Sequence, residues 1–232
     1  MTAASMLSVR LRVARAFTLT VCASASALLA PVGRTLRAQA LSYPALQVPT
    51  VVEREFTAAL VGGRGTMLLG QWRELISGDM HGGFDIGLYD PNAGRGNTTL
   101  FAAGHLGKQL ARADREQPLD VLLTAGAGLA IADGRSSLRV PIGAALGHTF
   151  ELEDGMALTP FVHPRASIDF CSSCSPRGRS ESDVSLNFDV GASFNFNRRL
   201  SARVSALFSG SDYFGGDALA VALTWTPAGL RR

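Results

Sequence analysis

The sequence predicts an all-β fold, a transmembrane antiparallel up-and-down β-barrel of about ten strands, with eight as the alternative count. First, residues 182–227 alternate apolar with polar or small side chains, which gives each strand two different faces. Second, the alternating runs are about 9–13 residues long. A tilted strand needs ~9–11 residues to cross a bilayer, whereas soluble strands average ~5–6. Third, a candidate secretory leader precedes them and indicates export.

The carboxy-terminal region shows the alternation most clearly. In its first run the apolar positions are Val184, Leu186, Phe188, Val190, Ala192, Phe194 and Phe196. A polar turn around Arg198 follows, and alternation resumes over residues 200–208 and again over residues 219–225. These three runs predict the last three strands of the barrel.

Seven further strands are expected upstream, although the first two have the weakest pattern. They cover residues 52–61, 66–75, 80–89, 98–110, 119–132, 137–150 and 156–170, separated by turn signals rich in Gly, Asp and Asn. If the amino terminus lies on the periplasmic side, two of the periplasmic connections, at 153–155 and 197–199, are very short. The outward connections are longer on average, as bacterial barrels prefer.

Residues 1–40 are expected to be a secretory signal peptide. Arg10, Arg12 and Arg15 form a basic region, an apolar stretch follows over residues 16–30, and Ala38-Gln39-Ala40 offers a cleavage site before Leu41. A retained anchor over residues 16–33 and a lipoprotein formed through Cys22 are the alternatives. No later apolar run reaches the length of a transmembrane helix.

The formal net charge of +3 belongs to the leader, because the first forty residues contain five arginines and no acid. The rest of the chain carries slightly more acidic than basic residues, so no nucleic-acid partner is expected. Residues 41–51, with Pro44 and Pro49, are expected to be an extended lead-in. Residues 52–227 then form the barrel, and residues 228–232 form a tail.

The two faces of the strands differ in charge. The apolar faces carry almost none, whereas the opposite parity holds Asp85, Arg139, Arg165, Asp169, Asp183, Asp189 and Arg203. In a closed barrel this places apolar residues in lipid and charges in the lumen. Trp225, Phe196 and Phe208 lie near strand ends, where an aromatic girdle is expected. A soluble secreted lipocalin-like binding barrel, with the apolar faces inside, is the alternative.

A polar cluster is expected in the lumen on the seventh and eighth strands. Its members share one parity and are His163, Arg165, Ser167, Asp169, Asp183, Asn187 and Asp189. We interpret them as paired charges and hydrogen bonds that fill the lumen, because a buried charge must be compensated. The alternative is an enzyme acting on lipid or peptide through His163, Ser167 and Asp169. Pro160 and Pro164 on the seventh strand predict irregular pairing there.

Cys171 and Cys174 remain after removal of the leader, in a C-x-x-C motif within an exported loop. We interpret the two cysteines as a small structural disulfide. A zinc site would need two more ligands, and His163 is the only imidazole nearby. No phosphate loop or dinucleotide fingerprint is present, so no metal and no cofactor are expected.

With these segments and an A-x-A signal ahead of them, the chain resembles the small outer-membrane β-barrel proteins of Gram-negative bacteria. The resemblance is one of pattern across residues 52–227, and it implies a location in the cell outer membrane. It also implies contact with outer-membrane lipid and with the barrel assembly machinery. Many members end in an aromatic residue, whereas Trp225 is followed here by seven further residues. A non-enzymatic structural, interaction or narrow-pore role is expected, with the ligand left open.

Overall fold

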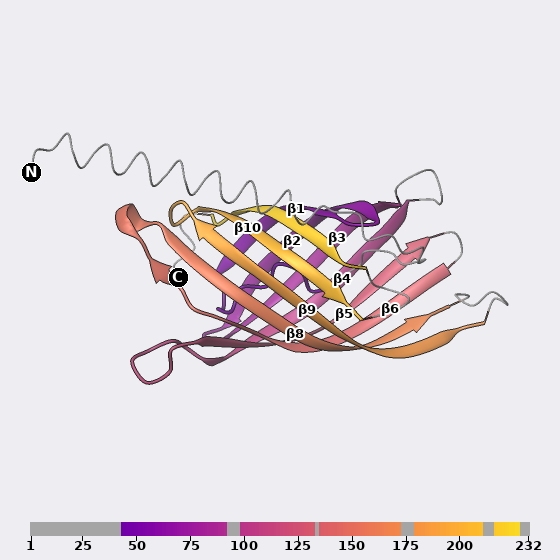
Figure 1. Cartoon of the computed structure of the whole chain (residues 1–232), viewed down its shortest axis with the longest axis horizontal. Helices are drawn as coiled ribbons and strands as arrows, with labels where there is room; N and C mark the ends of the chain where they lie inside the picture. The colour runs from indigo at the N-terminus through magenta and orange to yellow at the C-terminus, as the bar shows by residue number, and fades with distance from the viewer. Residues whose placement is uncertain (1–42, 92–97, 133–134, 173–178, 211–215, 228–232) are drawn as a thin grey trace, which may run out of the picture. The chain divides into compact units, whose positions relative to one another are not determined.

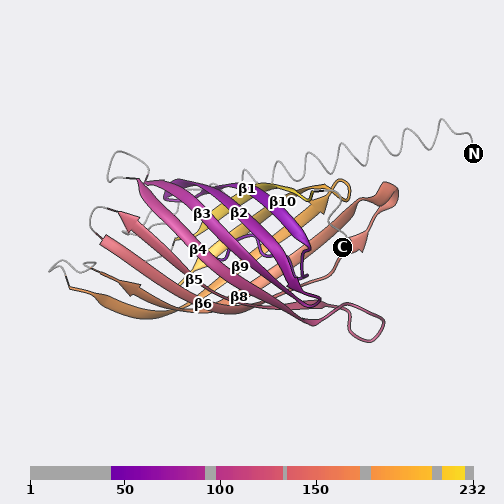
Figure 2. The same ribbon diagram turned by 180° about the vertical axis from the view of Figure 1, so that it is seen from behind.

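The computed structural model describes residues 43–91, 98–132, 135–172, 179–210 and 216–227. These form one antiparallel sheet whose strand order is β6-β5-β4-β3-β2-β1-β11-β10-β9-β8-β7. Because β6 also pairs with β8, the sheet closes into a barrel, which Figures 1 and 2 show from opposite sides. The predicted fold class is confirmed, with ten barrel strands rather than the alternative eight.

The barrel strands run antiparallel in chain order. They are β1 (Arg54–Gly62), β2 (Gly65–Ser77), β3 (Met80–Pro91), β4 (Thr99–Ala111), β5 (Asp120–Ala132), β6 (Arg135–Gly147), β8 (Ala157–Cys171), β9 (Glu181–Asn195), β10 (Leu200–Ser209) and β11 (Ala218–Trp225). We call the barrel end at which β1 begins the N-rim, and the end at which β1 finishes the loop rim. Trp225 is the register partner of Phe56 and therefore lies at the N-rim.

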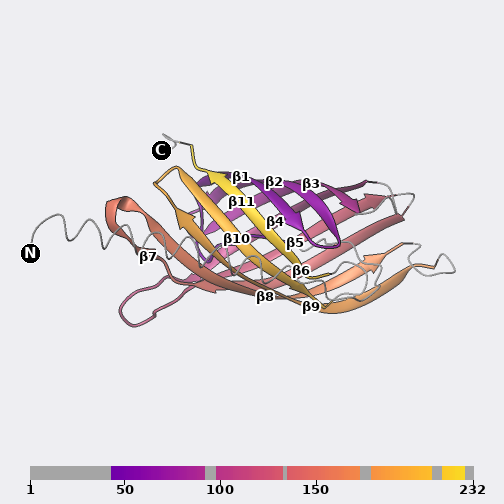
Figure 3. The same cartoon turned by 45° about the horizontal axis from the view of Figure 1, so that its top comes forward.

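One strand end differs from the prediction. The sixth strand was expected to reach residue 150, but β6 ends at Gly147, which pairs with Asp120, the first residue of β5. Since β5 offers no partner beyond Asp120, the chain leaves the barrel wall there. It continues as the two-residue β7 (Phe150–Glu151), which pairs with the start of β8, and then as the 3-10 turn η1 (Glu153–Gly155). Figure 3 shows this extension at the N-rim.

The irregular pairing expected around the prolines of β8 is present on one side. Pro160 and Pro164 both point outward. On the β9 side the register continues through both prolines. On the β6 side pairing breaks between Gly143↔Arg165 and Leu146↔Val162, so the interruption spans Pro164. A proline has no N–H to donate to its neighbour, which accounts for the missing contact on one side.

The outward face of the barrel is apolar along its length. Leu186 is 75% exposed, Leu223 59% and Ile142 56%, and similar exposure recurs on every barrel strand. The outward-facing charges of the described strands lie toward strand ends, at Arg54, Glu74, Asp90 and Lys108. Contact of so many apolar side chains with water would be energetically unfavourable, whereas their contact with the apolar interior of a lipid bilayer is favourable.

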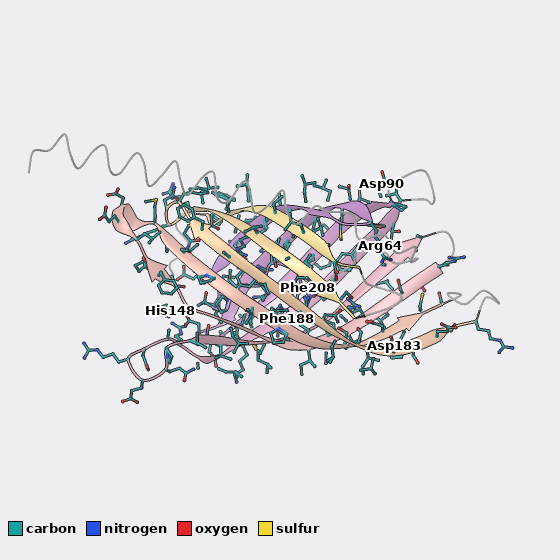
Figure 4. All side chains as sticks on the ribbon, in the orientation of Figure 1. Arg64, Asp90, His148, Asp183, Phe188 and Phe208 are labelled. Carbon is teal, nitrogen blue, oxygen red and sulfur yellow. The ribbon has the colours of Figure 1, made fainter. Side chains whose placement is uncertain are left out.

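Aromatic side chains mark the N-rim border of this apolar face. At the N-rim, Phe84, Trp72, Phe56 and Trp225 are successive register partners across β3, β2, β1 and β11. Phe208, near the end of β10, pairs with Phe188 in the middle of β9, and the two lie together on the outside of the barrel (Figure 4). The structure therefore adds Phe56, Trp72 and Phe84 to the predicted Trp225 at the N-rim, whereas a girdle at the loop rim stays a prediction.

The core of the protein lies inside the barrel and is only partly polar. An apolar cluster joins lumen-facing residues of β1, β2, β3, β4 and β10, with Leu69, Phe101 and Leu207 at most 4% exposed. The remaining lumen is lined by buried charged and polar side chains. No helix in the described ranges is long and apolar enough to cross a membrane.

Candidate functional site

The wall formed by β6, β8 and β9 carries a ladder of paired charges. Arg139 and Asp169 are register partners, and the guanidinium of Arg139 donates Nε to Oδ1 at 2.8 Å and Nη2 to Oδ2 at 2.9 Å. The Ser185 hydroxyl donates to the same Oδ2 at 2.8 Å from β9. Both charges are almost fully buried, so this two-point contact compensates the loss of hydration.

The next level of the ladder pairs Arg165 with Asp189. Arg165 donates Nη2 to Asp189 Oδ1, and both side chains are fully buried. His163 Nδ1 lies 3.8 Å from the other carboxylate oxygen, and its Nε2 shares a 2.8 Å hydrogen bond with the hydroxyl of Thr124. The ladder thus continues from β9 through β8 toward β5.

The structure brings six of the seven predicted cluster residues into this ladder. Asn187 donates Nδ2 to the Ser167 hydroxyl at 2.9 Å, between the two ion pairs. Asp183 is the exception, because it lies half-buried near the loop rim and accepts the backbone N–H of Val184 at 2.8 Å. Figure 4 shows Asp183 at the same end of the barrel as Arg64 and Asp90.

The ladder is not arranged for nucleophilic catalysis. His163 and Ser167 are separated by four residues of one strand, which corresponds to roughly 13 Å. Ser167 is bonded to Asn187, His163 to Thr124, and Asp169 to Arg139. An acyl-transfer triad needs its serine and histidine within hydrogen-bond reach. The geometry therefore does not support the enzyme alternative.

A second charge cluster lies on the opposite wall, and only its members Arg203 and Asp85 were placed in the lumen from the sequence. Glu55 on β1 accepts Arg73 Nη1 at 2.6 Å from β2 and Arg203 Nη1 and Nη2 at 2.9 and 2.6 Å from β10. All three side chains are at most 4% exposed. Glu55 and Arg73 share the lumen parity of their strands, so the period-2 pattern could have indicated them.

Two histidines extend this second cluster along β3 and β4. Arg73 donates Nε to His105 Nε2 at 3.3 Å, and the His105 ring lies edge-on to that of His81 at 6.1 Å between centroids. Each ring packs over a glycine of the neighbouring strand, because a Cβ at Gly83 or Gly107 would collide with His105 or His81. Asp85 accepts Gln71 Nε2 at 3.1 Å beside them. His105 is therefore connected to both Arg73 and His81.

Residues 43–52 lie inside the lumen between these two walls, as the indigo segment of Figures 1 and 2 shows. Tyr43 is 2% exposed, and Leu46 and Gln47 are fully buried. The sequence predicted an extended lead-in over residues 41–51 and did not place it relative to the barrel. In the structure the segment bends at Leu46, whose φ is 58°. Segment 43–52 is not a strand and instead fills the space that the walls enclose. Its path requires polar partners in the lumen, because every buried backbone group needs a hydrogen bond.

No group of three or more His, Cys, Asp or Glu within the described residues could hold a metal ion. Cys171 is the last residue of β8 and is buried. Cys174 lies outside the described residues, so the disulfide between them stays a prediction.

No protein-family model matches the chain, and no curated protein matches it. Among solved structures it is similar to the KdgM porin, with 4% identity and a TM-score of 0.40 over 75% of this chain and 99% of that one. The KdgM porin in complex with disordered oligogalacturonate gives 5% identity and a TM-score of 0.41. The amino-terminal β-barrel domain of Pseudomonas aeruginosa OprF gives 10% identity and a TM-score of 0.33, over 74% of this chain and 93% of that domain. These likenesses concern the barrel fold.

The arrangement of the faces defines the class of protein. The backbone groups of the closed sheet pair with one another, and the exterior is apolar away from the strand ends. The charged side chains in the middle of the strands are buried inside. The chain is therefore a membrane-spanning β-barrel of the outer-membrane type, as the sequence predicted. A soluble barrel with the apolar parity inside does not fit, because that parity points outward on every barrel strand.

Proposed function

We propose that the chain is a structural or interaction protein of the outer membrane whose lumen is closed to general diffusion. The observation that carries this proposal is the filling of the lumen from wall to wall. Arg165 on β8 binds the carbonyl of Pro44, and Arg73 on β2 binds that of Ala45 at 3.1 Å, so segment 43–52 joins opposite walls.

The ion pairs on either side of segment 43–52 support the same conclusion. Each lumen arginine named above already faces a carboxylate of a neighbouring strand. Such pairs are costly to separate in a dry interior, so the walls do not rearrange readily to admit a solute. Barrels of about eight to ten strands also have interiors just wide enough for side chains or one small ligand. Outer-membrane lipid and the barrel assembly machinery remain the expected partners.

Conductance in planar bilayers tests this function. Refolded protein that shows the heat-dependent gel mobility of a closed barrel is inserted and held under voltage. We expect no stepwise conductance above that of the bare bilayer. Regular single-channel steps from the same folded preparation would overturn the proposal and favour a narrow passive pore.

A further inference from the structure

We propose that the lumen contains a binding site for a bent, proline-containing peptide, and that residues 43–52 occupy it as a tethered ligand. The inference rests on the closed lumen proposed above and adds what closes it. The site recognises a peptide mainly through its backbone, with two or three buried side chains adding selectivity.

Three consecutive carbonyls of segment 43–52 are each bound by an arginine from a different strand. Arg165 on β8 donates to the oxygen of Pro44. Arg73 on β2 donates Nη2 to that of Ala45 at 3.1 Å, and Gln71 Nε2 reaches the same oxygen at 3.3 Å. Arg203 on β10 donates Nη1 to that of Leu46 at 3.4 Å. A guanidinium bound to a carbonyl does not depend on the side chain of the residue that offers it.

These arginines are held in place without segment 43–52. Glu55 binds both Arg73 and Arg203, and Asp189 binds Arg165. Their charges are therefore compensated by the wall, and each guanidinium also donates to one carbonyl of the peptide. A site built in this way persists when the peptide leaves, since no ion pair depends on it.

The second half of segment 43–52 is bound by an amide and an imidazole. Gln109 on β4 accepts the N–H of Val51 at 2.8 Å and donates Nε2 to the carbonyl of Pro49 at 3.0 Å. His81 Nδ1 accepts the N–H of Val52 at 3.4 Å. A side-chain amide that donates and accepts in this way copies the pairing that a neighbouring strand would provide.

The two prolines fit a peptide held away from any strand. Pro44 and Pro49 have no N–H, so segment 43–52 carries two fewer donors that need a partner inside the barrel. Tyr43 packs edge-on against Phe101 at 5.7 Å between ring centroids, and Leu46 is fully buried in the apolar cluster of the lumen. These two side chains provide the selectivity that backbone contacts lack.

The test removes the tethered ligand and returns it as a separate peptide. A variant lacking residues 43–51 is refolded and its closed barrel checked by gel mobility, and its conductance is compared with that of the full chain. A synthetic peptide with the sequence of residues 43–52 is then added, beside a scrambled peptide of the same composition. We expect a silent full chain, a conducting variant, and block by the native peptide at a concentration at least tenfold lower than by the scrambled one.

The possible results separate this inference from the closed-lumen function. Conductance by the full chain would overturn both. A silent full chain with an equally silent, folded deletion variant would overturn the peptide site alone, because the wall side chains would then close the lumen. Equal block by the two peptides would also overturn it.

A point variant decides the matter if the deletion variant does not fold. Gln109→Leu in the full chain removes the contacts of that amide to Pro49 and Val51, together with its bonds to the carbonyls of Ala111 and Val121. We expect stepwise openings that the silent full chain does not show. Lys108→Leu is the matched control, because Lys108 is the neighbouring residue but points outward. Equal opening frequencies in Gln109→Leu, Lys108→Leu and the parent would overturn the proposal.

Discussion

The outside and the inside of this barrel are built by different rules. On the outside, each apolar residue faces lipid, a uniform solvent that requires hydrophobicity and little else. Outward residues such as Leu186 and Phe188 can consequently be replaced by other apolar residues. In the lumen, Arg139 faces Asp169 and Glu55 faces two arginines, and each partner is specific. The exterior tolerates variation that the interior does not, and stability measurements can quantify the difference.

The largest effect is expected from breaking a buried ion pair of the ladder. Asp169→Ala leaves the guanidinium of Arg139 buried without its carboxylate, and such losses cost about 3–5 kcal/mol. Ile168→Ala is the control, because Ile168 is the adjacent residue on β8 and is 48% exposed to lipid. Denaturant unfolding of both variants in lipid vesicles measures the difference. A loss for Asp169→Ala no greater than that for Ile168→Ala would contradict the comparison.

A charge placed on the outer face tests the opposite rule. Ile142 lies outward in the middle of β6, and Ile142→Arg should cost about 2–4 kcal/mol in the free energy of unfolding at the bilayer midplane. Leu200→Arg supplies the depth control, since Leu200 begins β10 at the N-rim, where the cost falls to about 0–1 kcal/mol. Equal destabilisation of the two variants would mean that Ile142 and Leu200 do not lie at the different bilayer depths assumed here.

The alternation of side chains explains why the outer wall could be predicted from the sequence. A period of two assigns each residue of a strand to lipid or lumen, and a run of such residues also sets the strand length. The boundaries of β8 and β9 fall within one or two residues of the prediction for that reason. The prediction was wrong at residues 148–150, where the alternating pattern continues beyond the end of the partner strand. A strand ends where its hydrogen-bonding partner ends, even if the alternation of side chains continues.

The contents of the lumen could be predicted only in part. Register partners such as Arg139 and Asp169 follow from strand order, but the link between Arg165 and Pro44 joins residues 121 positions apart. Nothing periodic marks residues 43–52, since they form no strand. Their two prolines predicted an extended segment, and its place inside the barrel depends on cross-barrel contacts that a local pattern does not contain.

A smaller effect is expected from a methyl group in the lumen. Gly83→Ala would bring a Cβ against the ring of His105, whereas at Gly70, on the outer parity of β2, the nearest atom lies 3.8 Å away. Overpacking of this kind typically costs about 1–3 kcal/mol, and Gly70→Ala should be nearly neutral. Thermal unfolding monitored by gel mobility compares the two. Adding His105→Ala to Gly83→Ala should restore part of the lost stability. If it does not, the contact with His105 is not the cause of the destabilisation.

An effect of similar size is expected at the seam between the first and last strands. Thr57 on β1 and Thr224 on β11 are register partners in the lumen, and their hydroxyls share a 2.8 Å hydrogen bond. Thr57→Val keeps the shape but leaves the buried Thr224 hydroxyl without that partner, which should cost about 1–3 kcal/mol. Replacing both threonines by valine removes the polar pair together, so the double variant should be more stable than either single one. If the losses of unfolding free energy in the two single variants add up to the loss in the double variant, this hydrogen bond does not couple the two strands that close the barrel.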